Sequence, residues 1–323
     1  MQRQRGGLVP IGDAVSGLDD VLAPAIPAAS PPARRGFTVA DQVNQLVAAS
    51  GANPDRGFMA RLMALCSLPR TNPGNQLQYK RTNGPYTLIM TATGNYKLPF
   101  GHLPRLLMAW VSTEAVQTQS RVLILGDSLS DFMRVLGIYS SDGKAYTRLR
   151  NQMERLFNAS VRLIYKDEYG EASVSSSVAD STAFWWNPKR PDERSLWKSK
   201  IELGEKFFQE IINHPVPLDM NTLTAMKRSP LGLDLYMWLV YRTFPLRASQ
   251  RISWVSLYRQ FGVDPERSSD KRTVDNFRTD CLRELKKIKI PWPELNYATA
   301  KGVLILLPST PKIAPLNQGQ IES

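Results

Sequence analysis

Two segments of the chain carry the same pattern of apolar and polar positions at helical spacing. Residues 103–111 read Leu-Pro-Arg-Leu-Leu-Met-Ala-Trp-Val, and residues 231–239 read Leu-Gly-Leu-Asp-Leu-Tyr-Met-Trp-Leu. Both patterns predict amphipathic helices. Their similarity indicates that the chain contains an internal repeat.

The same succession of elements follows both segments. A short strand pattern comes next, at 121–125 and at 251–253, and then a short helix that ends at Gly137 or at Gly262. Glycine at these places permits the left-handed conformation that closes a helix. A third, longer helix follows in each case. Equal numbers of residues lie between equivalent positions, Trp110 to Phe157 and Trp238 to Leu285. This equal spacing predicts a duplicated unit.

Each third helix leads into a strand, a loop and a returning strand. These strands are expected at 161–166 and 183–186 in the first unit, and at 288–290 and 302–307 in the second. Helix, strand, helix, helix and hairpin is the order of a winged-helix domain, whose third helix enters the major groove of DNA. The sequence therefore predicts an α+β fold with two tandem winged-helix domains. The alternative is a pair of unrelated small α+β units.

Both third helices combine an apolar stripe with a second side that suits DNA. The stripes are Leu149, Met153, Leu156 and Phe157 in the first helix, and Val274, Phe277, Cys281, Leu285 and Ile288 in the second. The candidate DNA-binding residues of the first helix are Arg148, Arg150, Asn151 and Arg155. Those of the second are Arg272, Asn276, Thr279 and Arg283, flanked by Lys271, Lys286 and Lys287.

These residue types have defined partners on DNA. Arg bonds the O6 and N7 of guanine as a fork, Asn does the same for adenine, and Thr meets the thymine methyl. The flanking lysines are expected near phosphates, and Ser268 or Ser269 is expected to cap the second helix. The alternative is a solvated helix face whose Arg and Lys serve solubility. Repetition on two equivalent helices favours the DNA interpretation.

The charge balance agrees with a polyanionic partner. The chain has 41 Lys and Arg against 29 Asp and Glu, a net charge of +12, which favours double-stranded DNA. No apolar run approaches the roughly 18 residues of a membrane span, and no secretory signal is recognisable, so a cytoplasmic protein is expected. Cys66 and Cys281 lie far apart and are expected to be reduced, buried thiols.

The ends of the chain differ in composition from its middle. Residues 1–36 are rich in Ala, Pro and Gly and predict a flexible tail, and residues 311–323 have the same character. Between them, the first winged-helix domain is expected at 37–190 and to contact the DNA backbone. The second, at 191–310, is expected to be the main reader of base sequence.

One motif is similar to an active site. The stretch from Arg121 to Ser130, Arg-Val-Leu-Ile-Leu-Gly-Asp-Ser-Leu-Ser, resembles the nucleophile turn of GDSL esterases and would make Ser128 the nucleophile. That family also needs an Asp-x-x-His pair, but His102 and His214 have Pro and Ile three residues earlier. We therefore expect Asp127 or Ser128 to cap a helix instead. We expect no catalytic residues, no metal and no cofactor, and a phosphate loop for ATP is lacking.

Three segments resemble the plasmid replication initiator RepA family, closest to the IncW type. They are Leu-Pro-Phe-Gly-His-Leu-Pro-Arg-Leu-Leu-Met-Ala-Trp-Val-Ser-Thr-Glu-Ala from Leu98, Leu-Gly-Asp-Ser-Leu-Ser-Asp-Phe-Met from Leu125, and Ser-Pro-Leu-Gly-Leu-Asp-Leu-Tyr-Met-Trp-Leu-Val-Tyr-Arg from Ser229. The resemblance covers about residues 55–312.

This resemblance implies a function in starting plasmid replication. Such proteins bind repeated sites called iterons in the plasmid origin, help open the neighbouring duplex, and recruit the host initiator and the replicative helicase. Relatives in other plasmid groups also act as dimeric autorepressors, with the first domain as the dimer interface and monomers as the initiating form, which implies dimerisation through residues 37–190 here. The alternative function is a plasmid-encoded winged-helix transcriptional repressor without initiator activity, and GDSL-type esterase activity is a remote third.

Overall fold

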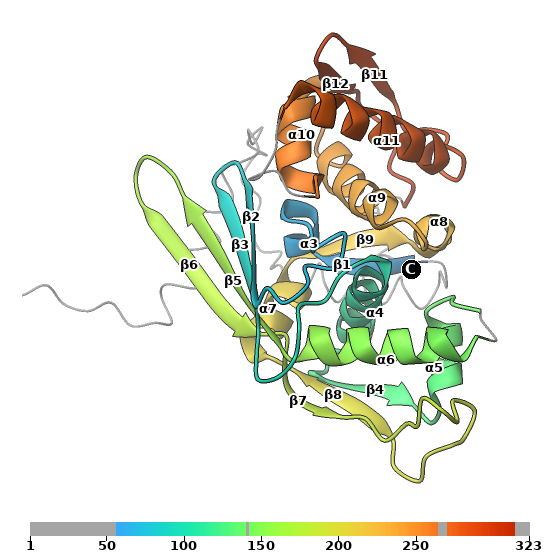
Figure 1. Cartoon of the computed structure of the whole chain (residues 1–323). Coiled ribbons are helices and arrows are strands. Elements are labelled where there is room, and N and C mark those ends of the chain that lie inside the picture. The colour runs from blue at the N-terminus through green and yellow to red at the C-terminus, as the bar shows by residue number, and fades with distance from the viewer. Residues whose placement is uncertain (1–55, 140–141, 264–269, 314–323) are drawn as a thin grey trace, which may run out of the picture.

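The structure, a computed structural model, describes residues 56–139, 142–263 and 270–313. The expected N-terminal tail at 1–36 and most of the expected C-terminal tail at 311–323 lie outside these residues. Helices and strands both contribute substantially, which confirms the predicted α+β class. Figure 1 shows the elements around a central group of helices.

Two parts of the chain share one order of elements and one order of strands. The first consists of α4 (His102–Thr118), β4 (Val122–Gly126), α5 (Leu129–Val135), α6 (Gly143–Phe157), β7 (Ala179–Ala183) and β8 (Ser199–Leu203). The second consists of α9 (Pro230–Thr243), β10 (Gln250–Ser253), α10 (Trp254–Phe261), α11 (Lys271–Lys289), β11 (Tyr297–Ala300) and β12 (Val303–Leu306). Their sheets have the orders β4-β8-β7 and β10-β12-β11, so in both the last strand lies between the other two. We call these parts the first and the second unit.

The hairpin expected after the first third helix belongs to a different sheet. Residues 161–166 fall in β5 (Ala159–Lys166), which pairs with β3 (Tyr86–Ala92) and with β6 (Glu171–Ser177), and β2 (Gln78–Asn83) completes the order β2-β3-β5-β6. The closing hairpin is instead β7 and β8. Because β8 pairs with β4, this sheet spans the expected domain boundary at 190.

The remaining elements join the two units. Strand β1 (Arg56–Ala60) pairs with β9 (Pro215–Asp219), and α3 (Arg61–Leu65) packs against α9. Helices α7 (Glu205–Asn213) and α8 (Met220–Met226) connect the end of the first unit to the start of the second. One hydrophobic core runs through all of these elements.

Helix ends agree with the sequence in some places and differ in others. Gly137 has φ of +66° just after α5, as predicted. Gly262 does not take the left-handed conformation, since its φ is −63°; a Cβ there would lie 2.5 Å from the Tyr258 ring, so close approach explains the glycine. Helix α11 is capped by Asp270, whose carboxylate accepts from the Thr273 N–H. Ser268 and Ser269 lie outside the described residues.

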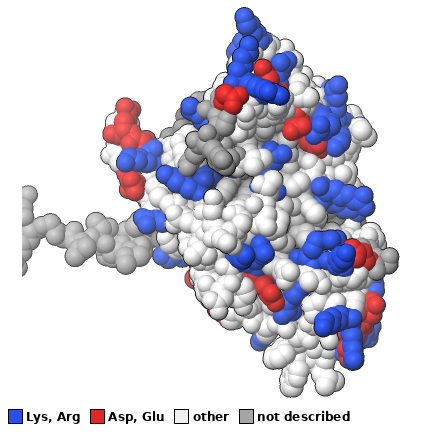
Figure 2. All heavy atoms as spheres, viewed as in Figure 1, with Lys and Arg blue, Asp and Glu red and all other residues white. Residues whose placement is uncertain are grey.

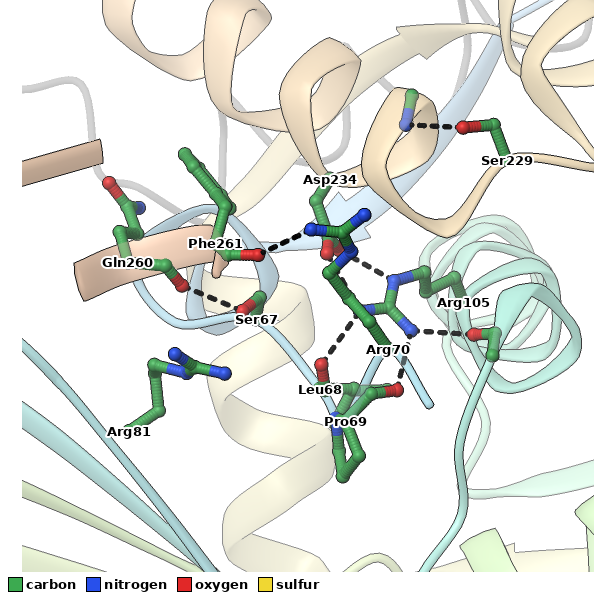
Figure 3. Close-up of polar contacts among 12 residues, drawn as sticks. Ser67, Leu68, Pro69, Arg70, Arg81, Arg105, Ser229, Asp234, Gln260 and Phe261 are labelled. Carbon is green, nitrogen blue, oxygen red and sulfur yellow. Dashed lines mark hydrogen bonds and ion pairs between the residues drawn. The ribbon is translucent and has the colours of Figure 1, made fainter. Parts of the chain in front are cut away.

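A buried ion pair ties the first helices of the two units together (Figure 3). The Arg105 guanidinium in α4 donates to both carboxylate oxygens of Asp234 in α9, each at 2.7 Å, and both side chains are fully buried. The same guanidinium donates to the carbonyls of Leu68, Pro69 and Gly101. Each N–H group of the guanidinium therefore has a hydrogen-bond acceptor, and the paired charges fix α4 against α9.

A second group of polar contacts lies beside this pair. Ser67 donates to the Gln260 carbonyl at 2.8 Å, and Arg70 donates to the Phe261 carbonyl at 3.2 Å. Arg81, which is 2% exposed, donates to the carbonyls of Arg259 and Gly262 at the end of α10. The segment before α4 therefore holds the second unit through backbone carbonyls, independently of hydrophobic packing.

The two cysteines are free and buried, as expected. Burial raises the pKa of the Cys66 thiol to about 12 and also raises that of Cys281. Both thiols are therefore protonated at neutral pH and act as small apolar groups in the core.

Candidate nucleic-acid interface

Helix α11 presents its candidate residues to solvent. Its apolar stripe is buried, with Val274, Phe277, Cys281, Leu285 and Ile288 all in the core. On the other side, Arg272, Asn276, Thr279 and Arg283 are exposed, and so are Lys271, Lys286 and Lys287. The helical period that buries the stripe thus turns all seven candidates outward.

Several of these side chains have partners on their own helix. Arg283 donates to Asp280 at 2.7 Å and lies 3.6 Å from Glu284. Lys287 lies 3.0 Å from the buried Glu284 carboxylate, and the Thr279 hydroxyl donates to the Asp275 carbonyl. Within the described residues no polar contact is recorded for Arg272 or Asn276. These two side chains can therefore reach a ligand without breaking a contact.

Two of the four candidate DNA-binding residues of helix α6 are exposed to solvent, and the other two pack against neighbouring segments. Arg148 and Asn151 are exposed, and Arg148 lies 3.4 Å from the Asp142 carboxylate that caps the helix. Arg150 donates to Glu154 at 2.7 Å and stacks over the Phe184 ring. Arg155 stacks over the Phe100 ring and donates to the Leu98 carbonyl. Arg150 and Arg155 thus brace the helix against neighbouring segments.

Further cations lie between the two helices. Lys227 and Arg228 directly follow α8, and Lys227 donates to the Gly137 carbonyl at 2.6 Å. His102 begins α4, and burial together with the charges of Arg105, Arg148 and Arg228 lowers its pKa. Arg148 of α6 and Arg228 before α9 therefore both lie near the start of α4.

Sequence reasoning missed Lys227 and Arg228. The available signal was a pair of cations shortly before the predicted helix at residue 231. Figure 2 shows Lys and Arg side chains over α11, beside the end of α8 and over α6, on one face of the molecule. Acidic side chains are interspersed, but basic ones predominate on this face.

Ser128 is the helix cap that the sequence predicts. Its hydroxyl oxygen accepts from the Asp131 N–H at 3.1 Å and its hydroxyl lies 2.6 Å from the Asp131 carboxylate, whose pKa this hydrogen bond lowers. The Ser128 side chain is 1% exposed. His214 ends α7 and lies 3.9 Å from Glu210.

Replacing Ser128 with alanine is expected to lower the free energy of unfolding by about 1 kcal/mol, because α5 loses its cap. Urea unfolding followed by circular dichroism measures this change. A chromogenic acyl ester is expected to be hydrolysed at the same background rate by both proteins. A rate that falls with the substitution would instead assign Ser128 a nucleophilic role.

The described residues contain no cluster of three or more His, Cys, Asp and Glu placed to bind a metal ion. Among the helices of those residues, none combines the length and apolar character needed to cross a membrane.

One family model matches part of the chain. Residues 98–256 match the family model described as plasmid encoded RepA protein. Two solved structures share 15% identity with the chain: selenomethionine derivatives of domains 2 and 3 of RctB, with a TM-score of 0.48 over 77% of this chain and 95% of that one, and the RctB domains 2-3, with 0.46 over 78% and 98%. No curated protein matches the chain.

Proposed function

Because residues 98–256 belong to the plasmid-encoded RepA family, we propose that this chain is a plasmid replication initiator that binds repeated sites in its own plasmid origin. The observation that carries the proposal is the exposed basic and amide face of α11, repeated in part on α6 at the equivalent place of the first unit. The protein acts by binding, and its side chains supply sequence recognition.

Both units are interpreted as winged-helix domains. The support is their shared order of helix, strand, helix, helix and hairpin, together with the shared strand order in which the last strand lies in the middle. In such domains the third helix enters the major groove. Helices α6 and α11 are therefore the reading helices, and β5 and β6 form an insertion that enlarges the first unit.

The two reading helices engage one duplex together. Arg272 and Asn276 of α11 are placed for base edges, whereas Lys271, Lys286 and Lys287 are placed for phosphates. On α6 the exposed Arg148 and Asn151 are the side chains placed for base edges. Lys227 and Arg228 contact the DNA backbone between the two reading helices. Successive major grooves on one side of DNA are about 34–36 Å apart. The Arg105–Asp234 pair fixes α4 of the first unit against α9 of the second, and so limits the movement of the two units relative to each other.

Opening of the origin follows from binding by several copies. Bending or unwinding DNA costs several kcal/mol per site, which the contacts of many protomers on adjacent repeats offset. The host initiator and the replicative helicase are the proposed partners at the opened duplex, and a dimer that represses its own promoter is the proposed second form.

The test has two parts. A footprint of the purified chain on its plasmid's origin is expected to show protected repeats. A plasmid that carries this origin but lacks the gene is expected to replicate only in cells that supply the chain. Repression of a promoter without plasmid maintenance would favour the transcriptional repressor, and absence of any footprint would refute the DNA-binding proposal.

Lys286 allows phosphate contacts to be counted. Replacing it with alanine is expected to weaken binding to all duplex sequences alike and to lower the slope of log affinity against log salt by about one, because one fewer counterion is released. Fluorescence anisotropy across a salt series measures the slope. Lys206→Ala, which removes an exposed lysine of α7 outside both reading helices, is the comparison. An unchanged slope for Lys286→Ala would remove Lys286 from the interface.

A further inference from the structure

The first unit has a long loop between β7 and β8 that carries exposed apolar side chains. It spans residues 184–198, whereas the equivalent turn in the second unit contains only Lys301 and Gly302 between paired strands. Three large apolar side chains on the loop face solvent: Trp185 at 56% exposed, Leu196 at 98% and Trp197 at 69%. An exposed group of this kind marks an interaction site.

The loop is held in place at its middle. The Ser130 N–H at the start of α5 donates to the Pro191 carbonyl, and the Ser195 N–H donates to the Asp127 carbonyl, both at 3.0 Å. Trp186 is buried and packs on the Phe132 ring, with 5.4 Å between centroids. Leu196 therefore projects directly beyond a segment fixed to the core, so its exposure is built into the fold.

The loop lies beside the reading helix of its own unit. A groove of about 830 Å³ is lined by Gly143, Tyr146 and Thr147 from the first turns of α6, and by Pro188, Lys189, Pro191 and Asp192 from the loop. Thr147 adjoins the exposed Arg148. A duplex that contacts this end of α6 thus passes the loop.

The charges of the loop indicate what contacts the apolar side chains. Four exposed cations interleave with them, Lys189, Arg190, Arg194 and Lys198, against the two acids Asp192 and Glu193. Glu193 lies 3.8 Å from Arg190. Duplex DNA has negatively charged phosphates on its outside and stacked, largely apolar bases inside. The cations of the loop therefore suit the phosphates, and the leucine and tryptophan side chains suit the bases.

We infer that Leu196 and Trp197 form a wedge that inserts between base pairs of duplex DNA next to the α6 contact and kinks it. This inference rests on the proposed function and identifies a second mode of contact within it. Leucine and aromatic side chains that enter the minor groove unstack a base step and bend the duplex away from the inserted side chain. The kink weakens base stacking at one step of the duplex. Binding of α6 to the repeat determines which step this is, because the loop lies beside α6.

The test compares two variants of the full chain. Leu196→Ser/Trp197→Ser removes the wedge, and Tyr169→Ser removes an aromatic side chain that is 89% exposed on the turn between β5 and β6. The probe is the duplex that the wild-type chain selects from a random pool, with a fluorescence-transfer pair at its ends and 2-aminopurine placed at successive steps. Circular dichroism confirms that both variants are folded.

The wild-type chain and Tyr169→Ser are expected to bring the duplex ends closer and to raise 2-aminopurine emission at one step. The wedge variant is expected to lose both signals and to bind about tenfold more weakly. Equal bending of the duplex by the wedge variant and by the wild-type chain would overturn the inference. Binding to single-stranded oligo(dT) is measured in parallel, and a variant that loses only this binding would also overturn it. If the wild-type chain selects no duplex from the pool, the proposed DNA-binding function is refuted, and the wedge inference is refuted with it. If the chain selects a duplex but does not bend it, only the wedge inference is refuted.

Discussion

Replacing Asp234 with alanine is expected to lower the free energy of unfolding by about 3–5 kcal/mol, because Arg105 then remains charged and fully buried without its partner. The carbonyls of Leu68, Pro69 and Gly101 still accept hydrogen bonds from the guanidinium, but none of them carries a compensating charge. Urea unfolding measures the loss.

Two controls separate burial from charge in this experiment. Asp180→Ala breaks an ion pair with Arg121 in which both side chains are partly exposed, and its expected cost is within about 1 kcal/mol. Arg105→Met/Asp234→Leu removes both buried charges and is expected to cost less than Asp234→Ala alone. An unfolding midpoint for Asp234→Ala equal to that of the wild-type chain would show that the pair does not hold the units together.

The periodic parts of the fold could be predicted from the sequence. Apolar residues at helical spacing located α4, α6, α9 and α11, and the serine before α5 located its cap. These features depend on neighbours within a few positions along the chain, so a local pattern contains the necessary information.

Long-range pairing could not be predicted in the same way. Strand β5 follows the first reading helix and has the alternation expected of a wing, yet it pairs with β3, whose alternating burial matches its own. The insertion moved the true hairpin to β7 and β8. The sequence of residues 159–183 alone does not show whether β5 pairs with β3 or forms the closing hairpin, because both pairings would bury the same face of β5.

The candidate site shows a similar division. Exposure of Arg148, Asn151 and the α11 residues follows from helical period, and the structure places all of them outward. The packing contacts of Arg150 and Arg155 depend on Phe184 and Phe100, which come from segments outside the helix. The sequence does contain a signal for the ion pair, because Arg105 and Asp234 are the only charged residues of the two similar segments 103–111 and 231–239, and their charges are opposite.

Removing three side chains from α11 is expected to have the largest effect on DNA recognition. Each specific base contact contributes about 1–3 kcal/mol, so Arg272→Ala/Asn276→Ala/Arg283→Ala is expected to weaken binding to the selected duplex by about 3 kcal/mol or more, roughly 100-fold or greater. Arg283 contributes least, because it must leave Asp280, at 2.7 Å, before it reaches a base. Anisotropy titrations at fixed salt measure the change.

The size of the effect on unrelated DNA decides what these side chains contact. Two of the three lost groups are cations, so binding to a scrambled duplex is expected to weaken as well, but by a smaller factor. Arg162→Ala, which removes an exposed arginine of β5 outside both reading helices, is expected to leave the ratio between the two duplexes unchanged. An equal loss on both duplexes for the α11 variant would show that α11 touches phosphates alone, and base recognition would then have to come from Arg148 and Asn151 of α6.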